Sequence, residues 1–224
     1  MNINLTFQEF PKLSRFARET IITEKIDGTN GQVLIYDPVE NTEAAEGFTS
    51  AADDTGKVWN IMAASRTRWI TPASDNHGFA RWAWDNAESL VRLGPGRHFG
   101  EWWGSGIQRG YGLQKGEKRF SLFNVQRWCL HGEQPQRIIT ADPRIEKYQD
   151  VLPPCCGLVP VLARGSFDTI SFMAHEALMR LQDQGSFAAP GFMKPEGIVI
   201  FHVAGNVGFK RTLEKDDQPK SIAQ

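Results

Sequence analysis

Short apolar segments, each closed by turn-forming residues, constrain the fold of this chain most. Eight runs of strand length are rich in Val, Ile and Phe and are bounded by Gly, Pro, Asn or Asp. This pattern is typical of β-strands rather than of helices. The expected strands are residues 20–26, 31–36, 57–65, 97–103, 119–128, 157–163, 197–203 and 206–213.

Only two segments have helical periodicity, and they predict helices at 76–92 and 168–184. Asp168 is the expected N-cap of the second helix, and Gly185 is its expected end. Many strands with few helices favour one α+β domain, which we expect to span residues 1–224.

Two polar stretches are expected to lie outside the strands and helices. The acidic, turn-rich segment 37–56 predicts a loop that projects from a hairpin. The polar tail after Leu213 is expected to fray.

Composition narrows the class of protein. A chain of 224 residues with 41% hydrophobic and 23% charged residues is typical of a globular protein with one sizeable core. Its apolar runs are too short to cross a membrane, and MNINLTFQEF lacks a secretory signal pattern, so no membrane partner is expected. Three cysteines without zinc-type spacing predict a reducing, cytoplasmic compartment. The net charge of −1 neither favours nor excludes a nucleic-acid partner.

The segment TEKIDGTNG places Lys25 at the end of an apolar strand. Gly28 allows a tight turn, after which the strand GQVLIY is expected to return alongside the first. A lysine beside acids is usually half of a solvated ion pair, here with Asp27. A lysine flanked by cations loses its proton more easily and can act as a nucleophile. The four residues KIDG alone do not separate these two readings.

Five later segments add groups suited to phosphate and nucleotide chemistry. SRTR offers guanidinium groups, which bind phosphate or ribose hydroxyls. GEWWG and EGIVI each bring one carboxylate to a strand end, FSLFNV is an aromatic strand, and GFK supplies a late lysine.

This ordered series resembles the covalent nucleotidyltransferases, which include nucleic-acid ligases and RNA-capping guanylyltransferases. The resemblance runs from about residue 23 to 212, and EKIDGTNG with GEWWGSGIQRGY is most similar to the nick-sealing RNA ligases. It implies a ligase-type, ATP-grasp-like nucleotidyltransferase fold of two antiparallel β-sheets with flanking helices. It also implies an ATP-dependent ligase, acting on RNA rather than DNA with Mg²⁺ or Mn²⁺. Such an enzyme joins a 5′-phosphate to a 3′-hydroxyl through lysyl-AMP and an adenylated 5′ end, on RNA ends or a nicked duplex.

The resemblance further implies roles for individual residues: Lys25 as the adenylated nucleophile, Glu24 beside the base, Glu101 on the ribose, Phe123 on adenine, Lys210 on the α-phosphate, Arg66 on the nucleotide and the incoming 5′-phosphate, Asn30 at the nucleic-acid end, and Glu196 on a metal or its water shell. Asp27 has two open roles, orienting Lys25 or helping to bind metal. Phe123 as a core residue and Glu101 paired with Arg109 are the ordinary alternatives.

Two features depart from the family's pattern. Its last motif usually carries two lysines at alternate positions, whereas only Lys210 occurs here, between Gly208 and Thr212. Few residues follow Lys210, so we expect that the appended OB-fold or helical domain of most ligases is absent, and that a partner protein replaces it. These departures leave two alternatives, a GTP-using guanylyltransferase and a catalytically reduced protein that binds nucleic-acid ends.

Overall fold

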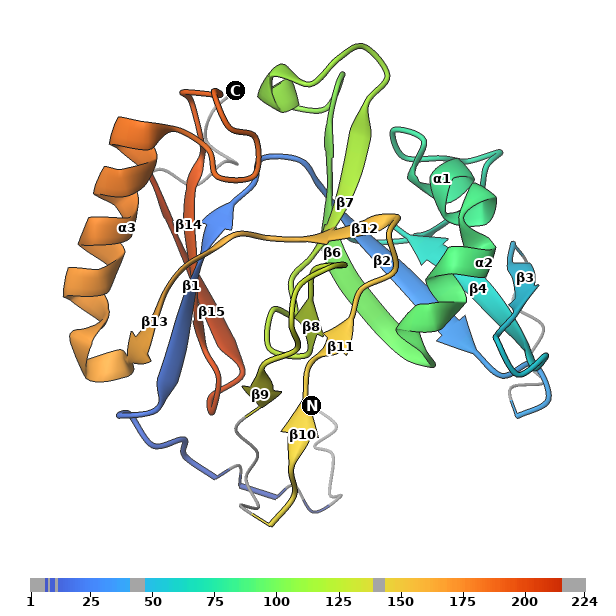
Figure 1. The fold of residues 1–224 in the computed structure, drawn as a ribbon, viewed down its shortest axis with the longest axis horizontal. Helices are drawn as coiled ribbons and strands as arrows, with labels where there is room; N and C mark the ends of the chain where they lie inside the picture. The colour runs from blue at the N-terminus through green and yellow to red at the C-terminus, as the bar shows by residue number, and fades with distance from the viewer. Residues whose placement is uncertain (1–6, 8, 11, 41–46, 139–143, 215–224) are drawn as a thin grey trace, which may run out of the picture.

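Two β-sheets lie next to each other, and helices cover the outer side of each (Figure 1). The computed structural model describes residues 7, 9–10, 12–40, 47–138 and 144–214. Among these residues, no helix is both long and apolar enough to cross a membrane.

The smaller sheet has four antiparallel strands in the order β13-β1-β14-β15. These are β1 (Glu19–Lys25), β13 (Val161–Ser166), β14 (Gly197–His202) and β15 (Val207–Thr212). Helix α3 (Ile170–Gln184) follows a 3-10 turn at Phe167–Thr169 and covers the outer face. Its buried side chains Ala174, Ala177 and Leu181 pack with Ile22 and Ile198 of the sheet.

The larger sheet has seven strands in the order β12-β7-β6-β2-β4-β3, with β5 paired to β4. Its members are β2 (Thr29–Tyr36), β3 (Thr49–Ala52), β4 (Val58–Ala64), β5 (Trp69–Ile70), β6 (Gly96–Gly104), β7 (Lys118–Leu122) and β12 (Cys156–Leu158). All pairings are antiparallel except that of β12 with β7. A 3-10 turn at Gly110–Gly112 lies between β6 and β7.

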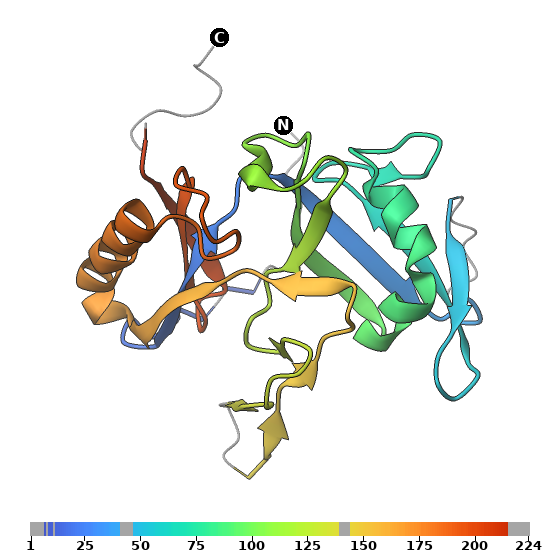
Figure 2. The same ribbon diagram turned by 45° about the horizontal axis from the view of Figure 1, so that its top comes forward.

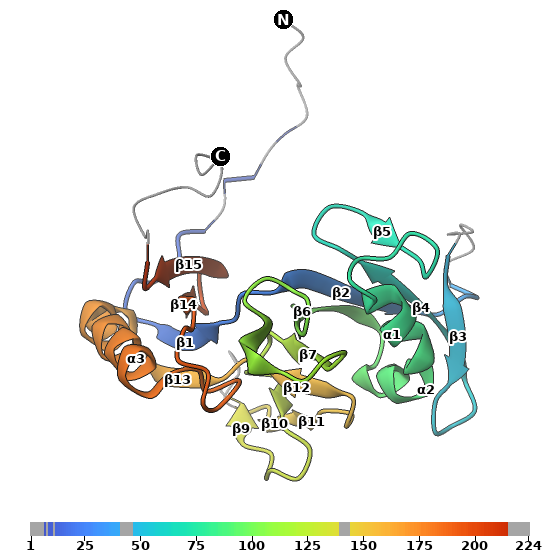
Figure 3. The same cartoon turned by 90° about the horizontal axis from the view of Figure 1, so that it is seen from above.

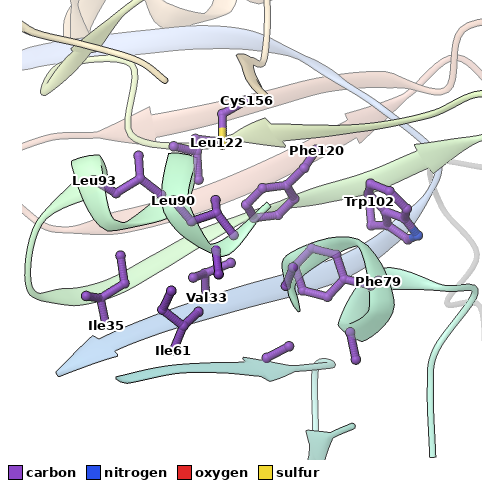
Figure 4. Close-up of a cluster of buried hydrophobic side chains, with 14 of the residues drawn as sticks. Val33, Ile35, Ile61, Phe79, Leu90, Leu93, Trp102, Phe120, Leu122 and Cys156 are labelled. Carbon is purple, nitrogen blue, oxygen red and sulfur yellow. The ribbon is translucent and has the colours of Figure 1, made fainter. Parts of the chain in front are cut away.

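The main core lies between the larger sheet and the helices α1 (Phe79–Asp85) and α2 (Ala87–Leu90) with the 3-10 turn Val91–Leu93 (Figure 4). Alternate residues of β2 and β4, such as Val33, Ile35 and Ile61, are fully buried there, together with Phe79 and Leu90. Because side chains alternate between the two faces of a strand, their neighbours point to the opposite, helix-free face.

Four short strands form a separate extension, which projects beyond the two sheets in Figures 1 and 2. Strands β8 (Trp128–Cys129) and β11 (Asp150–Val151) pair in parallel, and β9 (Arg137–Ile138) pairs with β10 (Lys147–Tyr148).

The predicted hairpin at Gly28 is wrong. Strands β1 and β2 do not pair; β1 belongs to the smaller sheet and β2 to the larger one, so the chain crosses between the sheets at residues 26–28 (Figure 3). Gly28 is needed for close approach, since a Cβ atom there would lie 2.5 Å from the carbonyl oxygen of Trp102 and 2.8 Å from Cβ of Trp103.

Other predictions are corrected in their bounds. The expected strand 157–163 is two strands, β12 and β13, which belong to different sheets. The expected strand 119–128 ends at Leu122. The expected loop 37–56 contains β3, and its residues 41–46 lie outside the described residues, as does the tail from 215 onward.

The two predicted helices exist, but their ends differ. The segment 76–92 breaks at Asn86, whose side-chain amide donates to the Trp82 carbonyl and so competes with the helical backbone bonds. The longer helix begins after Thr169 rather than after Asp168, which lies inside the 3-10 turn. It ends at Gly185 with φ 78°, as predicted.

Candidate active site

A cleft of about 1230 Å³ lies between the two sheets. Strands β1, β14 and β15 line one wall, and β2, β6 and the segment after β7 line the other. Eight of the nine residues predicted for the site border this cleft: Glu24, Lys25, Asp27, Asn30, Arg66, Glu101, Phe123 and Lys210. The ninth, Glu196, contacts Lys25.

Lys25 is the last residue of β1, and its side chain borders the cleft. Its Nζ atom donates to Oε2 of Glu196 at 2.6 Å, and the two side chains form an ion pair. Lys25 lies opposite Gly197 at the start of β14, which brings the preceding residue, Glu196, beside it. The lysine side chain keeps 20% of its surface exposed to the cleft, whereas that of Glu196 keeps 4%.

Glu24 points away from Lys25, because consecutive strand residues face opposite sides of a sheet. Its carboxylate accepts hydrogen bonds from the Ser186 hydroxyl at 2.6 Å and from the backbone N–H groups of Phe187 and Ala188 at 2.8 and 2.9 Å. Burial raises the pKa of Glu24, and these three donors oppose the rise. The carboxylate thus fastens the loop after α3 to β1, and a contact of Glu24 with a nucleotide stays a prediction.

Glu101 lies on the opposite wall, facing Asn30 across β6 and β2. Its two oxygens accept from the Gly28 N–H at 3.0 Å and from Asn30 Nδ2 at 3.1 Å. Burial raises the pKa of Glu101 to about 7, which outweighs the lowering by the Lys25 charge. The alternative of a Glu101–Arg109 pair does not hold, since Arg109 pairs elsewhere.

Asp27 is held in place by two groups from the segment between β6 and β7. Arg109 Nε donates to its carboxylate at 3.2 Å, and the Asp27 N–H donates to the Tyr111 hydroxyl at 2.8 Å. Arg109 also donates to the backbone carbonyls of Lys194 and Pro195, at 2.9 and 3.4 Å. One guanidinium therefore connects the crossover after Lys25 with the segment that leads to Glu196.

The sequence indicated Arg109 only as a possible partner for Glu101, and it gave Tyr111 no role. Tyr111 is buried with a left-handed backbone (φ 52°), which is uncommon for a bulky residue. The glycine-rich run GSGIQRGYG was the signal for an irregular, closely packed segment.

The cations predicted for phosphate lie at the rim of the cleft. Lys210 of β15 is opposite Val199, which is opposite Thr23 of β1, so its side chain shares the face of Thr23 and Lys25. Arg66 lies in the turn between β4 and β5, and both side chains are exposed. Arg211 pairs with Ile198 in the ladder and faces the opposite side, so it does not take the place of a second cleft lysine.

Phe123 follows β7 and keeps 42% of its surface exposed at the cleft. It is therefore not a core residue, in contrast to Phe120, which is 1% exposed. An exposed ring at a cleft is suited to stacking on a base.

The described residues contain no group of three or more His, Cys, Asp or Glu side chains placed to hold a metal ion. Glu196 contacts Lys25 directly, and the charges of Lys25, Glu196 and Asp27 all act on the Glu101 carboxyl group.

Comparison with known proteins identifies the family of this fold and cleft. A family model described as RNA ligase matches residues 18–213. The chain belongs to the RNA ligase family. That match extends from the start of β1 to the end of β15 and thus includes every residue of the site described above.

Solved RNA ligase structures agree with this membership at the level of the fold. A mutant of the Naegleria gruberi RNA ligase with ATP and Mn is 18% identical, with a TM-score of 0.50, over 89% of this chain and 51% of that chain. The same ligase with PPi is 19% identical, with a TM-score of 0.49, over 88% and 50%. The chain thus spans about half the length of the ligase chains that it matches. No curated protein matches it.

Proposed function

We propose that this member of the RNA ligase family is an ATP-dependent RNA ligase that acts through lysyl-AMP. The observation that carries the proposal is the setting of Lys25, an amine exposed to a large cleft and held at 2.6 Å by a buried carboxylate. A lysine with only a structural role does not need to be exposed to a cleft. This cleft is also bordered by arginine, lysine and exposed aromatic side chains, which suit it to a nucleotide.

In the proposed first step, the Lys25 Nζ atom attacks the α-phosphorus of ATP. The new N–P bond replaces the bond between the α-phosphorus and the bridging oxygen of the β-phosphate, and pyrophosphate leaves. Nζ must give up a proton in this step, and Oε2 of Glu196 is the acceptor already in hydrogen-bond contact. AMP then passes to the 5′-phosphate of an RNA end, and a 3′-hydroxyl displaces it.

The other cleft residues divide between orientation and charge. Arg66 and Lys210 would neutralise phosphate oxygens, because positioning and charge stabilisation carry most of phosphoryl-transfer catalysis. The exposed ring of Phe123 would stack on the base. Glu101 would accept a hydrogen bond from a ribose hydroxyl, and Asn30, whose side chain is fixed by Glu101, would approach the nucleic-acid end.

A divalent cation fits this set of donors in a particular way. Mg²⁺ binds hard oxygen ligands and is usually held by one or two carboxylates together with substrate phosphates and water. Glu196 is the carboxylate we assign to it, directly or through water, with Asp27 as the second candidate. When bound, Mg²⁺ or Mn²⁺ would reduce the negative charge of the triphosphate.

We further propose that residues 1–224 act as one nucleotidyltransferase domain in the cytoplasm. Its three cysteines are free, which suits a reducing compartment. A partner protein that supplies further contacts to the RNA is part of the same proposal.

The decisive experiment is incubation with ATP labelled at the α-phosphate and Mg²⁺ or Mn²⁺. We expect acid-labile label on the wild-type protein and none on Lys25→Met. Preferential labelling by GTP would indicate a guanylyltransferase instead. RNA-end binding without any label on the wild type would indicate a protein that binds ends and has lost catalysis.

A further inference from the structure

The helix-free face of the larger sheet carries a row of side chains that continues away from the cleft centre. Phe99 of β6 is opposite Gln32 of β2, Gln32 is opposite Ala64 of β4, and Ala64 is opposite Trp69 of β5. Opposite residues of antiparallel strands project to the same face. The four side chains therefore form one line across the sheet, which we call the Phe99–Trp69 row.

This row lies on the same side of the sheet as the proposed site. Phe99 is two residues before Glu101 on β6, so both face the cleft, and Phe99 itself borders it. The residues adjacent to the row in sequence, including Val33, Ala63 and Ile70, point into the core on the opposite face. At about 3.3 Å per residue, the row is roughly 7 Å from Glu101 along the strand.

Large aromatic surface is exposed at both ends of the row. Phe99 is 52% exposed and Trp69 is 43% exposed, and the intervening Ala64 is small. With strands about 4.8 Å apart, the two rings are separated by roughly 14 Å across three strand spacings. Two exposed aromatic rings on one open sheet face mark a binding surface rather than a core.

The charge around the row identifies the chemistry of its occupant. The Arg97 guanidinium lies 5.4 Å from the centroid of the Trp69 ring, and Arg97 and Arg66 both border the cleft. Within the described part of the chain, neither arginine has a carboxylate in ion-pair contact. Aromatic rings with nearby arginines favour a flexible polyanion that carries flat, unpaired rings, which is single-stranded RNA.

We propose that the Phe99–Trp69 row, with Arg97, stacks unpaired bases of the RNA strand next to the joining site. The ligase would then prefer an end that carries single-stranded nucleotides over a fully paired nick, because paired bases offer no free face to Phe99 and Trp69. This inference rests on the proposed function, since it specifies the RNA that enters the same cleft.

The test measures RNA binding without ATP, so that it is independent of lysyl-AMP formation. Short 5′-phosphorylated RNA with 2-aminopurine at successive terminal positions is titrated with wild type, Phe99→Ala and Trp69→Ala. We expect a stacking signal at one or more positions and roughly 10-fold weaker binding for each variant. Trp69→Phe and Phe99→Tyr should restore most of the affinity, because they keep a ring.

Phe172→Ala is the matched control, since this ring is 65% exposed on α3, away from the cleft. It should leave RNA affinity unchanged and should form lysyl-AMP at the wild-type rate. The proposal is overturned if the wild type binds no single-stranded RNA, or if the alanine variants bind it as well as wild type does. It is also overturned if a fully paired nicked duplex binds the wild type as tightly as single-stranded RNA does and loses as much affinity in both alanine variants. Absence of label on Lys25 with a positive stacking result would count against the proposed catalysis alone.

Discussion

The Nζ atom of Lys25 lies 2.6 Å from Oε2 of Glu196, although 171 positions separate the two residues in the chain. The contact exists because β14 pairs with β1, so that Gly197 lies opposite Lys25. The amine therefore has one short, defined bond to a carboxylate that is almost fully buried.

Glu196→Gln removes the negative charge of residue 196 but keeps the size of its side chain. We expect lysyl-AMP formation to slow by about 100-fold or more, because the amine loses its nearest proton acceptor. Rates are followed with ATP labelled at the α-phosphate. Glu176→Gln, an exposed carboxylate on α3, is the control and should have the wild-type rate. An unchanged rate in Glu196→Gln would show that Glu196 is not the proton acceptor for Lys25 in the first step.

Glu24→Ala is expected to destabilise the protein by about 3 kcal/mol or more. The change leaves the Ser186 hydroxyl and two backbone N–H groups without their buried, charged acceptor. Urea unfolding measures the loss, with Glu176→Ala as the exposed control. If Glu24→Ala instead keeps its stability and loses only nucleotide affinity, its carboxylate is a nucleotide ligand rather than an anchor for the loop.

Stability should depend on pH through Glu101. An acid whose folded pKa lies above its unfolded value holds its proton more tightly when folded, so its contribution to stability is lost as pH rises between the two values. With a pKa of about 7 against an ordinary 4.5, the loss is up to about 3 kcal/mol between pH 4 and pH 8. Glu101→Gln has no charge to bury and should become more stable relative to wild type over this range. Denaturant unfolding at several pH values measures how the free energy of unfolding changes with pH. The same pH dependence in wild type and Glu101→Gln would contradict the prediction.

Arg109→Ala should slow lysyl-AMP formation by about 10-fold or more while leaving ATP affinity nearly unchanged. Arg109 does not itself line the cleft, but its hydrogen bonds connect Asp27 to the carbonyls just before Glu196. Its loss should let the nucleophile and its carboxylate drift apart, and small misplacements are costly in rate. The measurement is single-turnover labelling over a range of ATP concentrations.

Two further variants decide whether Arg109 acts by position. Arg109→Lys keeps one donor and should recover part of the rate. Arg92→Ala removes an exposed arginine in a 3.6 Å surface pair and should have no effect. A fall in ATP affinity as large as the fall in rate would show instead that Arg109 contributes to nucleotide binding.

Much of the fold could be predicted because strand periodicity is a local signal. The strands around Ile22, Val33 and Ile198 have buried, β-branched residues between turn formers, and they occur where the pattern indicates. The partner of each strand is not local information. Gly28 therefore looked like a hairpin turn, whereas the chain crosses between the two sheets there, with Gly28 packed against Trp102 and Trp103.

In the candidate site, too, local features could be predicted from the sequence and contacts between distant residues could not. The motifs around Lys25, Glu101 and Lys210 could be found because their order along the chain is itself a pattern. The ion pair of Lys25 with Glu196 and the bond of Tyr111 to Asp27 depend on register and on an irregular loop. Neither is encoded in residue spacing, so only the three-dimensional structure could reveal them.

The opposite orientations of Glu24 and Lys25 make β1 sensitive to changes in its length. A single-residue insertion or deletion in this strand ahead of Glu24 would exchange the two side chains if the pairing with β14 were kept, burying the amine and turning the acid toward the cleft. A change of length between β3 and β4, at residues 53–57, would not exchange the faces of β1. Length variation in this chain is thus expected to accumulate in its loops, while the strand that carries Lys25 keeps its residue count.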